Sequence, residues 1–511
     1  MQVESVGEIT VDYESQGWVS FGPISAAPVP SDLGEAQDGR RLELADVGRL
    51  ARRAMRSVVR AARAGEGLAF SSLLRAHLPG GIEDLSVVEE SWPAYDHINV
   101  QAGLDAWLGV PGRTHELVGV IGFQHSVFGL AELLGAGDEL GPMGMGMRPG
   151  NVARANLPAG PDGAVRPCVR CGLYLVSDGE RSTALLLRGS EPHSGHDSVT
   201  LQVLSSEPGF ATEATSRIRE LAIEHNVFRG QVLSFGGEIF GHGQSLLQFH
   251  HRPTLGAEEL ILPADVLQAV QRQVVEVARH KQRLLAAGQH LKRGLLLYGP
   301  PGVGKTHTVR YLTSSLVDTT VIQLTGDALH LISQACSIAR ALAPSMLIVE
   351  DVDLIAEDRG MYPGQHPMLF QLLNEMDGLA EDADVVFVLT TNRADLLEPA
   401  LAARPGRVDQ AVELALPDAD GRRALFELYR GGLVVDTSRL DDVIVRTEGV
   451  TASFLKELLR RAAVFAAERG AAQDRSPLAV SATDLDAALT ELLDTRNAMT
   501  RVLLGGTPVE P

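Results

Sequence analysis

Residues 291–312 read LKRGLLLYGPPGVGKTHTVRYL and decide the fold of the segment around them. An apolar run is followed by a glycine-rich turn and then by a helical stretch, which is the context that a phosphate-binding loop requires. The glycines let backbone N–H groups point at phosphate oxygens, and the following helix adds the positive end of its dipole. The stretch therefore predicts a nucleotide site at the edge of a parallel α/β sheet.

The residues of this loop have separate expected tasks. We predict that Lys305 contacts the β- and γ-phosphates and that the Thr306 hydroxyl binds Mg²⁺, so ATP and Mg²⁺ are the expected cofactors. The predicted nucleotide-binding residues form one continuous run: Gly299, Pro300, Pro301, Gly302, Val303, Gly304, Lys305, Thr306 and His307.

A second apolar run ends in acids. The sequence SMLIVEDVDLI starts at Ser345, and residues 346–349 predict a buried strand that carries Glu350, Asp351 and Asp353 at its C-terminal end. Parallel sheets place their active carboxylates at such strand ends. We expect Glu350 to hold Mg²⁺ through its water shell and Asp351 to polarise the attacking water.

A third apolar run, residues 385–389, predicts a neighbouring strand that delivers Thr391 and Asn392 to the same phosphate. Asn392 is expected to orient the attacking water through its amide. Arg404 and Arg407 follow on a Pro-Gly turn, too late in the domain to reach their own nucleotide. Because such arginines contribute roughly 10³ to 10⁵ in rate when they stabilise transition-state charge, we expect them to act on a neighbouring subunit's nucleotide.

Together, GPPGVGKT, LIVEDVD, LLNEMDGL, TTNRADLLEPAL and RPGRVD resemble the motifs of AAA ATPases, including the FtsH and proteasomal members. The Glu-Asp order also resembles the AAA group of the mitochondrial Rieske-protein translocase. The resemblance covers residues 255–493. It implies a P-loop α/β domain with a five-stranded parallel sheet at 255–417 and a helical lid at 418–495. It also implies a homo-oligomeric ring, a hexamer in that family, that hydrolyses ATP to remodel or disassemble a protein client.

The sequence departs from that family at three places. In the arginine turn, Ala402 and Ala403 precede Arg404, one residue more than usual, which leaves open whether Arg404 or Arg407 is the acting arginine. Most members have Asp-Glu where this chain has Glu350-Asp351, so we predict slower hydrolysis. Members that thread polypeptides grip them with an aromatic residue, an aliphatic residue and a glycine. Residues 325–345 contain no Phe, Tyr or Trp, which leaves Leu329, His330 and Leu331 as the candidates for gripping.

The composition restricts partners and location. The 511 residues carry 45 Lys and Arg against 65 Asp and Glu, and the formal charge of −20 disfavours nucleic acid. Three cysteines, an odd number, indicate a reducing compartment, and we expect a cytoplasmic location. The first residues, MQVESVGEIT, show no signal pattern. No apolar run is long enough for a membrane span; the nearest, residues 117–134, is interpreted as a buried strand or helix.

The sequence also contains four residues that could form a zinc site. Cys168 and Cys171 form a Cys-x-x-Cys pair that His193 and His196 could complete to four ligands. Because there is no second such pair and the interval contains a probable hairpin, we predict that zinc is not a partner. The sequence also has no HExxH helix, so we do not expect a fused peptidase of the membrane-protease kind.

The N-terminal half carries no catalytic motif. We predict an α+β region of unknown role at 1–140, with an arginine-faced helix at 41–64, then a linker at 141–150. A compact α+β module is expected at 151–252, with strands at 172–176, 183–187 and 231–235 and a helix at 214–225. Residues 496–511 are expected to form a flexible tail.

Two other functions remain open on the sequence. One is a nucleotide-dependent switch or scaffold with slow hydrolysis and no threading, which the absence of an aromatic gripping residue favours. The other is an ATPase that remodels nucleic acid, for which only the arginine face at 41–64 offers a basic surface.

Overall fold

The computed structural model describes residues 69–78, 85–125, 128–135, 147–179, 181–191, 196–207, 209–235, 247–354, 367–378, 380, 382–397, 407–469 and 477–494. The predicted helix at 41–64 and the predicted tail at 496–511 lie outside these residues. Most of the predicted linker at 141–150 does too, but its last three residues form a strand. Among the described helices, none combines the length and the apolar character needed to cross a membrane.

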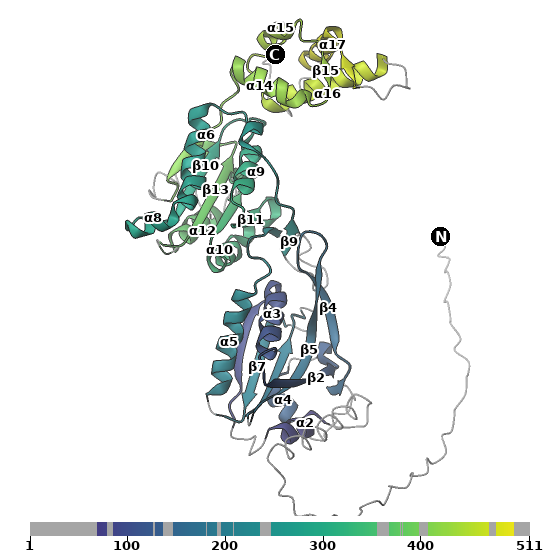
Figure 1. The fold of residues 1–511 in the computed structure, drawn as a ribbon, viewed down its shortest axis with the longest axis vertical. Helices are drawn as coiled ribbons and strands as arrows, with labels where there is room; N and C mark the ends of the chain where they lie inside the picture. Colours follow the sequence, from purple (N-terminus) through teal and green to yellow (C-terminus); the bar gives the residue numbers. More distant parts are fainter. Residues whose placement is uncertain are drawn as a thin grey trace, which may run out of the picture. The chain divides into compact units, whose positions relative to one another are not determined.

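The N-terminal part contains a seven-stranded sheet in which every adjacent pair is antiparallel (Figure 1). Its order is β1-β7-β6-β5-β2-β3, with β4 paired to β5. The strands are β1 (Val88–Pro93), β2 (Arg113–Ile121), β3 (Arg148–Gly150), β4 (Ala153–Pro158), β5 (Val165–Asp178), β6 (Arg181–Arg188) and β7 (Ser198–Ser205).

Helices cover both faces of this sheet because its central strands are apolar on both sides. Alternate residues of β5 belong to different cores: Leu173 and Leu175 pack with helices α2 (Phe70–His77) and α4 (Leu130–Gly135). Tyr174 and Val176 pack on the other face with α3 (His97–Leu108) and α5 (Phe210–Glu224). Such alternation follows from the two-residue period of a strand.

The structure confirms the predicted strands at 172–176 and 183–187 and the helix at 214–225, which lie in β5, β6 and α5. The predicted division at 141–150 is wrong, because β2 pairs with β5 across it from Arg113 to Gly119. The apolar run at 117–134 is not a single strand or helix. Its first residues belong to β2, which ends at Ile121, and its last residues belong to α4, which begins at Leu130.

The ATPase part contains a second seven-stranded sheet with the order β14-β10-β13-β12-β11-β8-β9. Its strands are β8 (Val232–Phe235), β9 (Leu247–His250), β10 (Arg293–Tyr298), β11 (Thr320–Leu324), β12 (Ser345–Val349), β13 (Val385–Thr391) and β14 (Gln410–Glu413). All pairs are parallel except β8 with β9. Every residue of β12 and β13 is buried, which confirms the two strands predicted from apolar runs.

The five-stranded sheet implied by the family resemblance is therefore extended by two strands. β8 pairs in parallel with β11, and β9 turns back along β8 to form the edge. The predicted module at 151–252 included both strands, so its boundary with the ATPase part is wrong. An apolar run in the sequence predicts a strand but does not show which other strand it pairs with. The ATPase sheet thus begins at β8.

Helices also cover both faces of the ATPase sheet. One face packs on α6 (Ala264–Gln271) and α9 (Lys305–Ser315), and the other on α10 (Ile332–Ala341) and α12 (Pro367–Asp377). The lid follows β14, and its described residues include four helices that enclose Phe426 and Leu458, together with the short parallel strands β15 (Val434–Val435) and β16 (Ala479–Val480). The helices are α14 (Ala419–Arg430), α15 (Leu440–Arg446), α16 (Ala452–Arg469) and α17 (Ala482–Leu493).

Arg252, which follows β9, joins three segments of the ATPase part. Its guanidinium donates to the carbonyls of Thr313 and Leu316 at the end of α9, at 2.6 and 3.0 Å. It also donates to Gly230, before β8, at 3.0 Å, and to Thr319, before β11, at 2.7 Å. A cation at a helix C-terminus satisfies carbonyls that have no partner within the helix.

We expect Arg252→Ala to weaken this joint by about 1.5–3 kcal/mol, the range for hydrogen bonds from a charged donor. Amide hydrogen exchange in β8 and in the last turn of α9 should then become faster, while exchange in the N-terminal sheet stays unchanged. The matched control is Arg283→Ala, which removes an exposed arginine from α8 (Lys281–Ala286). Equal exchange in the Arg252→Ala and Arg283→Ala variants would contradict the expectation.

Candidate nucleotide site

The phosphate loop leaves the C-terminal end of β10, in the interior of the sheet. Gly299, Gly302 and Gly304 have φ angles of 143°, 79° and 108°, all in the region that favours glycine. A Cβ atom on Gly299 would lie 2.2 Å from the carbonyl oxygen of Leu414. The loop therefore requires glycine at this position both for its backbone conformation and for its close approach to the chain after β14.

Lys305 starts α9 directly after Gly304 and is only 8% exposed. Its ammonium donates to the carbonyls of Gly299 and Pro300 at 2.8 and 2.9 Å, and to Asn392 Oδ1 at 2.7 Å. Burial lowers the pKa of Lys305, and the carboxylates of Asp351 and Asp353 act in the opposite direction. The loop and the end of β13 thus hold a positive charge at the expected phosphate position.

The acids after β12 lie at the same edge. Burial raises the pKa of Glu350, and the nearby charge of Asp351 raises it further. Asp351 has a φ of 49°, the one positive φ outside glycine in the described parts of the chain. Its Oδ1 accepts from Asn392 Nδ2 at 3.3 Å, so the Asn392 amide bridges Asp351 and Lys305.

The structure therefore brings together Lys305, Asn392, Asp351 and Glu350, which the sequence placed on three separate segments. Thr306 is exposed on the first turn of α9, where its hydroxyl is open to a ligand. The imidazole Nε2 of His307 lies 3.2 Å from the carbonyl oxygen of Glu259.

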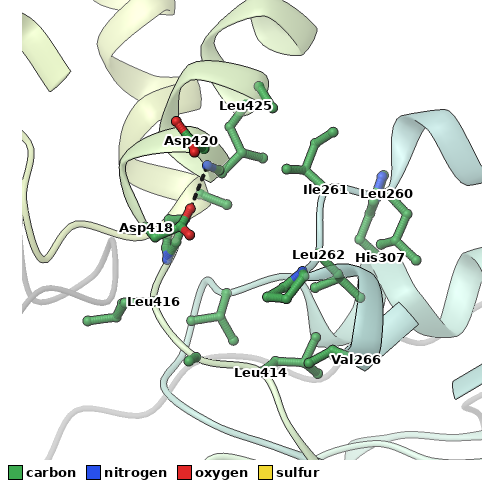
Figure 2. A pocket seen from close by; sticks show the side chains of 18 of the residues that line it. Leu260, Ile261, Leu262, Val266, His307, Leu414, Leu416, Asp418, Asp420 and Leu425 are labelled. Carbon is green, nitrogen blue, oxygen red and sulfur yellow. Dashed lines mark hydrogen bonds between the residues drawn. The ribbon is translucent and has the colours of Figure 1, made fainter. Parts of the chain in front are cut away.

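A cavity of about 540 Å³ adjoins the phosphate loop (Figure 2). Ile261 and Leu262 line one wall, and Leu425 of the lid lines the other. Val303 and His307 of the loop also line it. Its apolar walls next to a phosphate-binding loop suit the flat base of a nucleotide. The lid also contacts the loop, since Ser453 N donates to the Gly302 carbonyl at 3.3 Å.

No sequence motif marks this cavity. Its walls come from residues 257–266, from residues 413–425 and from Ala452, and they are mostly apolar without a motif. The apolar run 260–262, immediately before Pro263, was the one local signal that could have drawn attention to the first wall.

The two predicted arginines are not part of this cluster. Arg404 lies outside the described residues. Arg407 donates from Nε to Asp377 Oδ1 at 2.6 Å. Its backbone lies against Gly294, where a Cβ atom would come within 2.2 Å of the Arg407 carbonyl oxygen. Since Gly294 is the second residue of β10 and the phosphate loop follows the last one, Arg407 lies near the opposite end of the strand from the loop.

The predicted gripping residues need correction. They lie in the 3-10 helix η7 (Gly326–Leu331) after β11. Leu329 is 3% exposed in the core, and Leu331 is partly buried against the same core. Leu329 is therefore not available to contact a polypeptide outside the subunit, and Leu331 offers only part of its side chain. Only His330 is exposed.

The Cys-x-x-Cys pair lies within β5, and both thiols are free and buried. Cys168 packs in the core shared with the ATPase sheet, whereas Cys171 packs with α2 and α4. Burial raises the pKa of each thiol to about 12. His193 lies outside the described residues. Within the described ranges, no three His, Cys, Asp or Glu side chains are grouped so that they could hold a metal ion.

Comparisons with known proteins agree with this geometry. The sequence profile of the family described as "ATPase family associated with various cellular activities (AAA)" matches residues 295–416. The chain is 32% identical over 291 residues to the ATP-dependent zinc metalloprotease FtsH 4 of Sphaerobacter thermophilus, covering 53% of this chain and 43% of the relative. It is 29% identical over 272 residues to the chloroplastic ATP-dependent zinc metalloprotease FTSH 2 of Oryza sativa subsp. japonica, covering 50% and 39%. The chain thus spans less than half the length of these relatives.

The names of these relatives correct one prediction. Zinc was expected not to be a partner, yet both relatives are named zinc metalloproteases. The expectation was wrong because it rested only on ligand patterns within this sequence, while more than half of each relative lies outside the matched part.

The glycine loop, the parallel sheet, the carboxylates after β12 and the profile match all fall within one continuous domain. That domain binds and hydrolyses ATP, and its residues 295–416 belong to the AAA family of ATPases.

Proposed function

We propose that this chain forms an Mg²⁺-dependent ATPase ring in which hydrolysis is coupled to remodelling or disassembly of a protein client. The observation that carries the proposal is the separation of Arg407 from the site of its own subunit, at the far end of β10 from the phosphate loop. An arginine in that position can assist hydrolysis only at a neighbour's nucleotide. The site is then complete only at an interface between subunits.

The residues present suit Mg²⁺. In phosphate-transfer sites this ion is held by one or two carboxylates or hydroxyls together with phosphate oxygens and water. Thr306 offers an exposed hydroxyl, and Glu350 offers a carboxylate whose pKa is raised by burial and by Asp351. A divalent cation would offset both effects by favouring the charged carboxylate. When bound, Mg²⁺ would neutralise charge on the transferring phosphoryl group.

The side chains then divide the work. Lys305 and the loop amides bind the phosphates, and the cavity beside His307 receives the base. Asp351 polarises the attacking water, while Asn392 fixes the Asp351 carboxylate and orients the water through the other end of its amide. Arg407 of the next subunit, together with Arg404, stabilises charge in the transition state.

A test in trans separates a shared site from a self-contained one. Lys305→Ala subunits lack the phosphate-binding charge but retain Arg407, and Arg407→Ala subunits have the reverse defect. We expect each variant alone to be inactive at concentrations where the wild type assembles, and a mixture to recover part of the ATPase rate. Particle mass recorded beside each rate shows whether rings form.

Two outcomes would contradict the proposal. One is full activity of Arg407→Ala alone, and the other is a mixture that assembles but recovers nothing. Tight ATP binding and ring formation with negligible turnover in the wild type would instead support a nucleotide-dependent switch. The burial of Leu329 favours that second candidate, because it removes one of the three predicted gripping residues, and Leu331 is itself partly buried.

A further inference from the structure

Asp353 makes contacts that differ from those of the acids before it. Its Oδ1 accepts from Thr391 Oγ1 at 2.8 Å and from the backbone N–H of Asn392 at 3.3 Å. Both donors lie at the C-terminal end of β13. The Asp353 carboxylate therefore binds the start of the loop that carries Asn392.

This contact is one of several hydrogen bonds that connect the loops after β12 and β13. Thr390 accepts two hydrogen bonds from the loop after β12. The backbone N–H of Asp351 donates to the Thr390 hydroxyl at 3.1 Å, and the backbone N–H of Val352 donates to the Thr390 carbonyl at 2.9 Å. Thr390 and Thr391 are 2% and 0% exposed. Because such buried hydroxyls are costly to leave without a partner, the two loops hold each other in one arrangement.

The Asn392 side chain depends on that arrangement. Asn392 is itself exposed, so packing does not fix its rotamer. Its backbone N–H is held by Asp353, and its amide reaches Lys305 Nζ at 2.7 Å and Asp351 Oδ1 at 3.3 Å. A shift of the backbone at Asn392 would therefore move the group that bridges the phosphate-binding and water-polarising residues.

We propose that Asp353 is a positioning residue that sets the Asn392 amide for hydrolysis and does not itself bind Mg²⁺ or phosphate. The inference rests on the proposed role of Asn392 in orienting the attacking water. It reassigns Asp353, which the sequence placed at the phosphate with Glu350 and Asp351.

The proposal makes the acceptor atoms of residue 353 important and its charge less so. In Asp353→Asn the amide oxygen can still accept from Thr391 and Asn392, whereas Asp353→Ala removes the acceptor. A misplacement of about 1 Å can cost roughly a hundredfold in rate. We therefore expect Asp353→Ala to lower kcat by about 10- to 100-fold with KM for ATP within about threefold. Asp353→Asn should keep most of the wild-type kcat.

A double-mutant cycle with Asn392→Ala tests whether Asp353 acts through Asn392. We expect the double variant Asp353→Ala/Asn392→Ala to be no slower than Asn392→Ala alone, because residues that act through one group are not additive. Thr391→Val, which removes one donor without touching a charge, should give a smaller fall in kcat of the same kind. If Asp353→Ala fails to fold, the Thr391→Val variant still tests the proposal.

The possible failures can be told apart. If Asp353→Asn is as slow as Asp353→Ala, or if the double variant shows the product of the two single losses, Asp353 acts directly and the proposal is overturned. Wild-type kcat in both Asp353→Ala and Thr391→Val would also overturn it. Wild-type kcat in Asn392→Ala, with Asp353→Ala still slow, would instead refute the role given to Asn392 and with it the basis of the inference.

Discussion

Lys305→Ala is expected to reduce ATP turnover by at least about a hundredfold, the loss typical when one preorganised charge donor is removed from a reacting group. Lys305 is 8% exposed and its ammonium donates to two loop carbonyls and to Asn392, so its position is fixed before any phosphate arrives. Without the Lys305 ammonium, only the loop amides and Mg²⁺ would be available to neutralise the phosphate charge. Nucleotide affinity should fall as well, because in the proposed mechanism Lys305 contacts ATP both before and during the reaction.

The measurement is steady-state turnover together with the affinity for a fluorescent ATP analogue. The matched control is Lys281→Ala, which removes a partly exposed lysine whose ammonium lies 3.7 Å from Asp384. That variant should keep wild-type turnover, since α8 does not line the cavity. Turnover within threefold of wild type in Lys305→Ala would contradict the phosphate role of this residue.

Asp351→Asn is expected to lower kcat by roughly 10² to 10⁴, the range for loss of a general base, with KM changed by less than about fivefold. The amide keeps the size of the side chain and can still accept from Asn392, so ATP binding and ring assembly should be retained. Single-turnover measurements in preformed rings separate the chemical step from assembly. A wild-type rate for Asp351→Asn would assign the water-polarising role elsewhere.

Glu350→Gln is the companion variant, because Glu350 and Asp351 are adjacent and have different expected tasks. Loss of the Glu350 charge should raise the Mg²⁺ concentration needed for half-maximal rate. Loss of the Asp351 charge should lower the rate at saturating Mg²⁺. Identical Mg²⁺ titrations for the two variants would show that the two acids do not divide the work in this way.

The backbone at Asp351 also gives a physical reason for the Glu-Asp order. A φ of 49° lies in the left-handed region, which aspartate tolerates better than glutamate because its short side chain can bond locally. Asp351→Glu, which restores the longer acid of most family members, would therefore strain the loop. We expect it to slow hydrolysis rather than accelerate it.

Sequence patterns were most reliable where one short segment carries the whole signal. The strands β12 and β13 are continuous apolar runs, and the phosphate loop is a contiguous motif, so each could be located without knowledge of its partners. The convergence of Lys305, Asp351 and Asn392 followed from the rule that parallel strands end at the same edge.

The parts that the sequence could not predict depend on contacts between distant segments. Whether β8 belongs to the N-terminal sheet or to the ATPase sheet depends on its pairing with β11, nearly a hundred residues later. The cavity wall needs three apolar segments that share no motif. Leu329 looked available for gripping because the sequence does not reveal that α10 and the sheet enclose it.

The extra strands also decide where the ATPase can be separated from the rest of the chain. A fragment that began at Leu255, where the resemblance to the family begins, would lack β8 and β9 and leave β11 as the sheet edge. Val321 and Ile322, now 0% exposed, would border solvent, and the Val321 N–H would lose its 2.8 Å bond to the Gln231 carbonyl. Bare apolar edges of this kind pair with other chains and aggregate. A soluble fragment must therefore begin upstream of Gln231, so that the motor keeps the strands that cover its own edge.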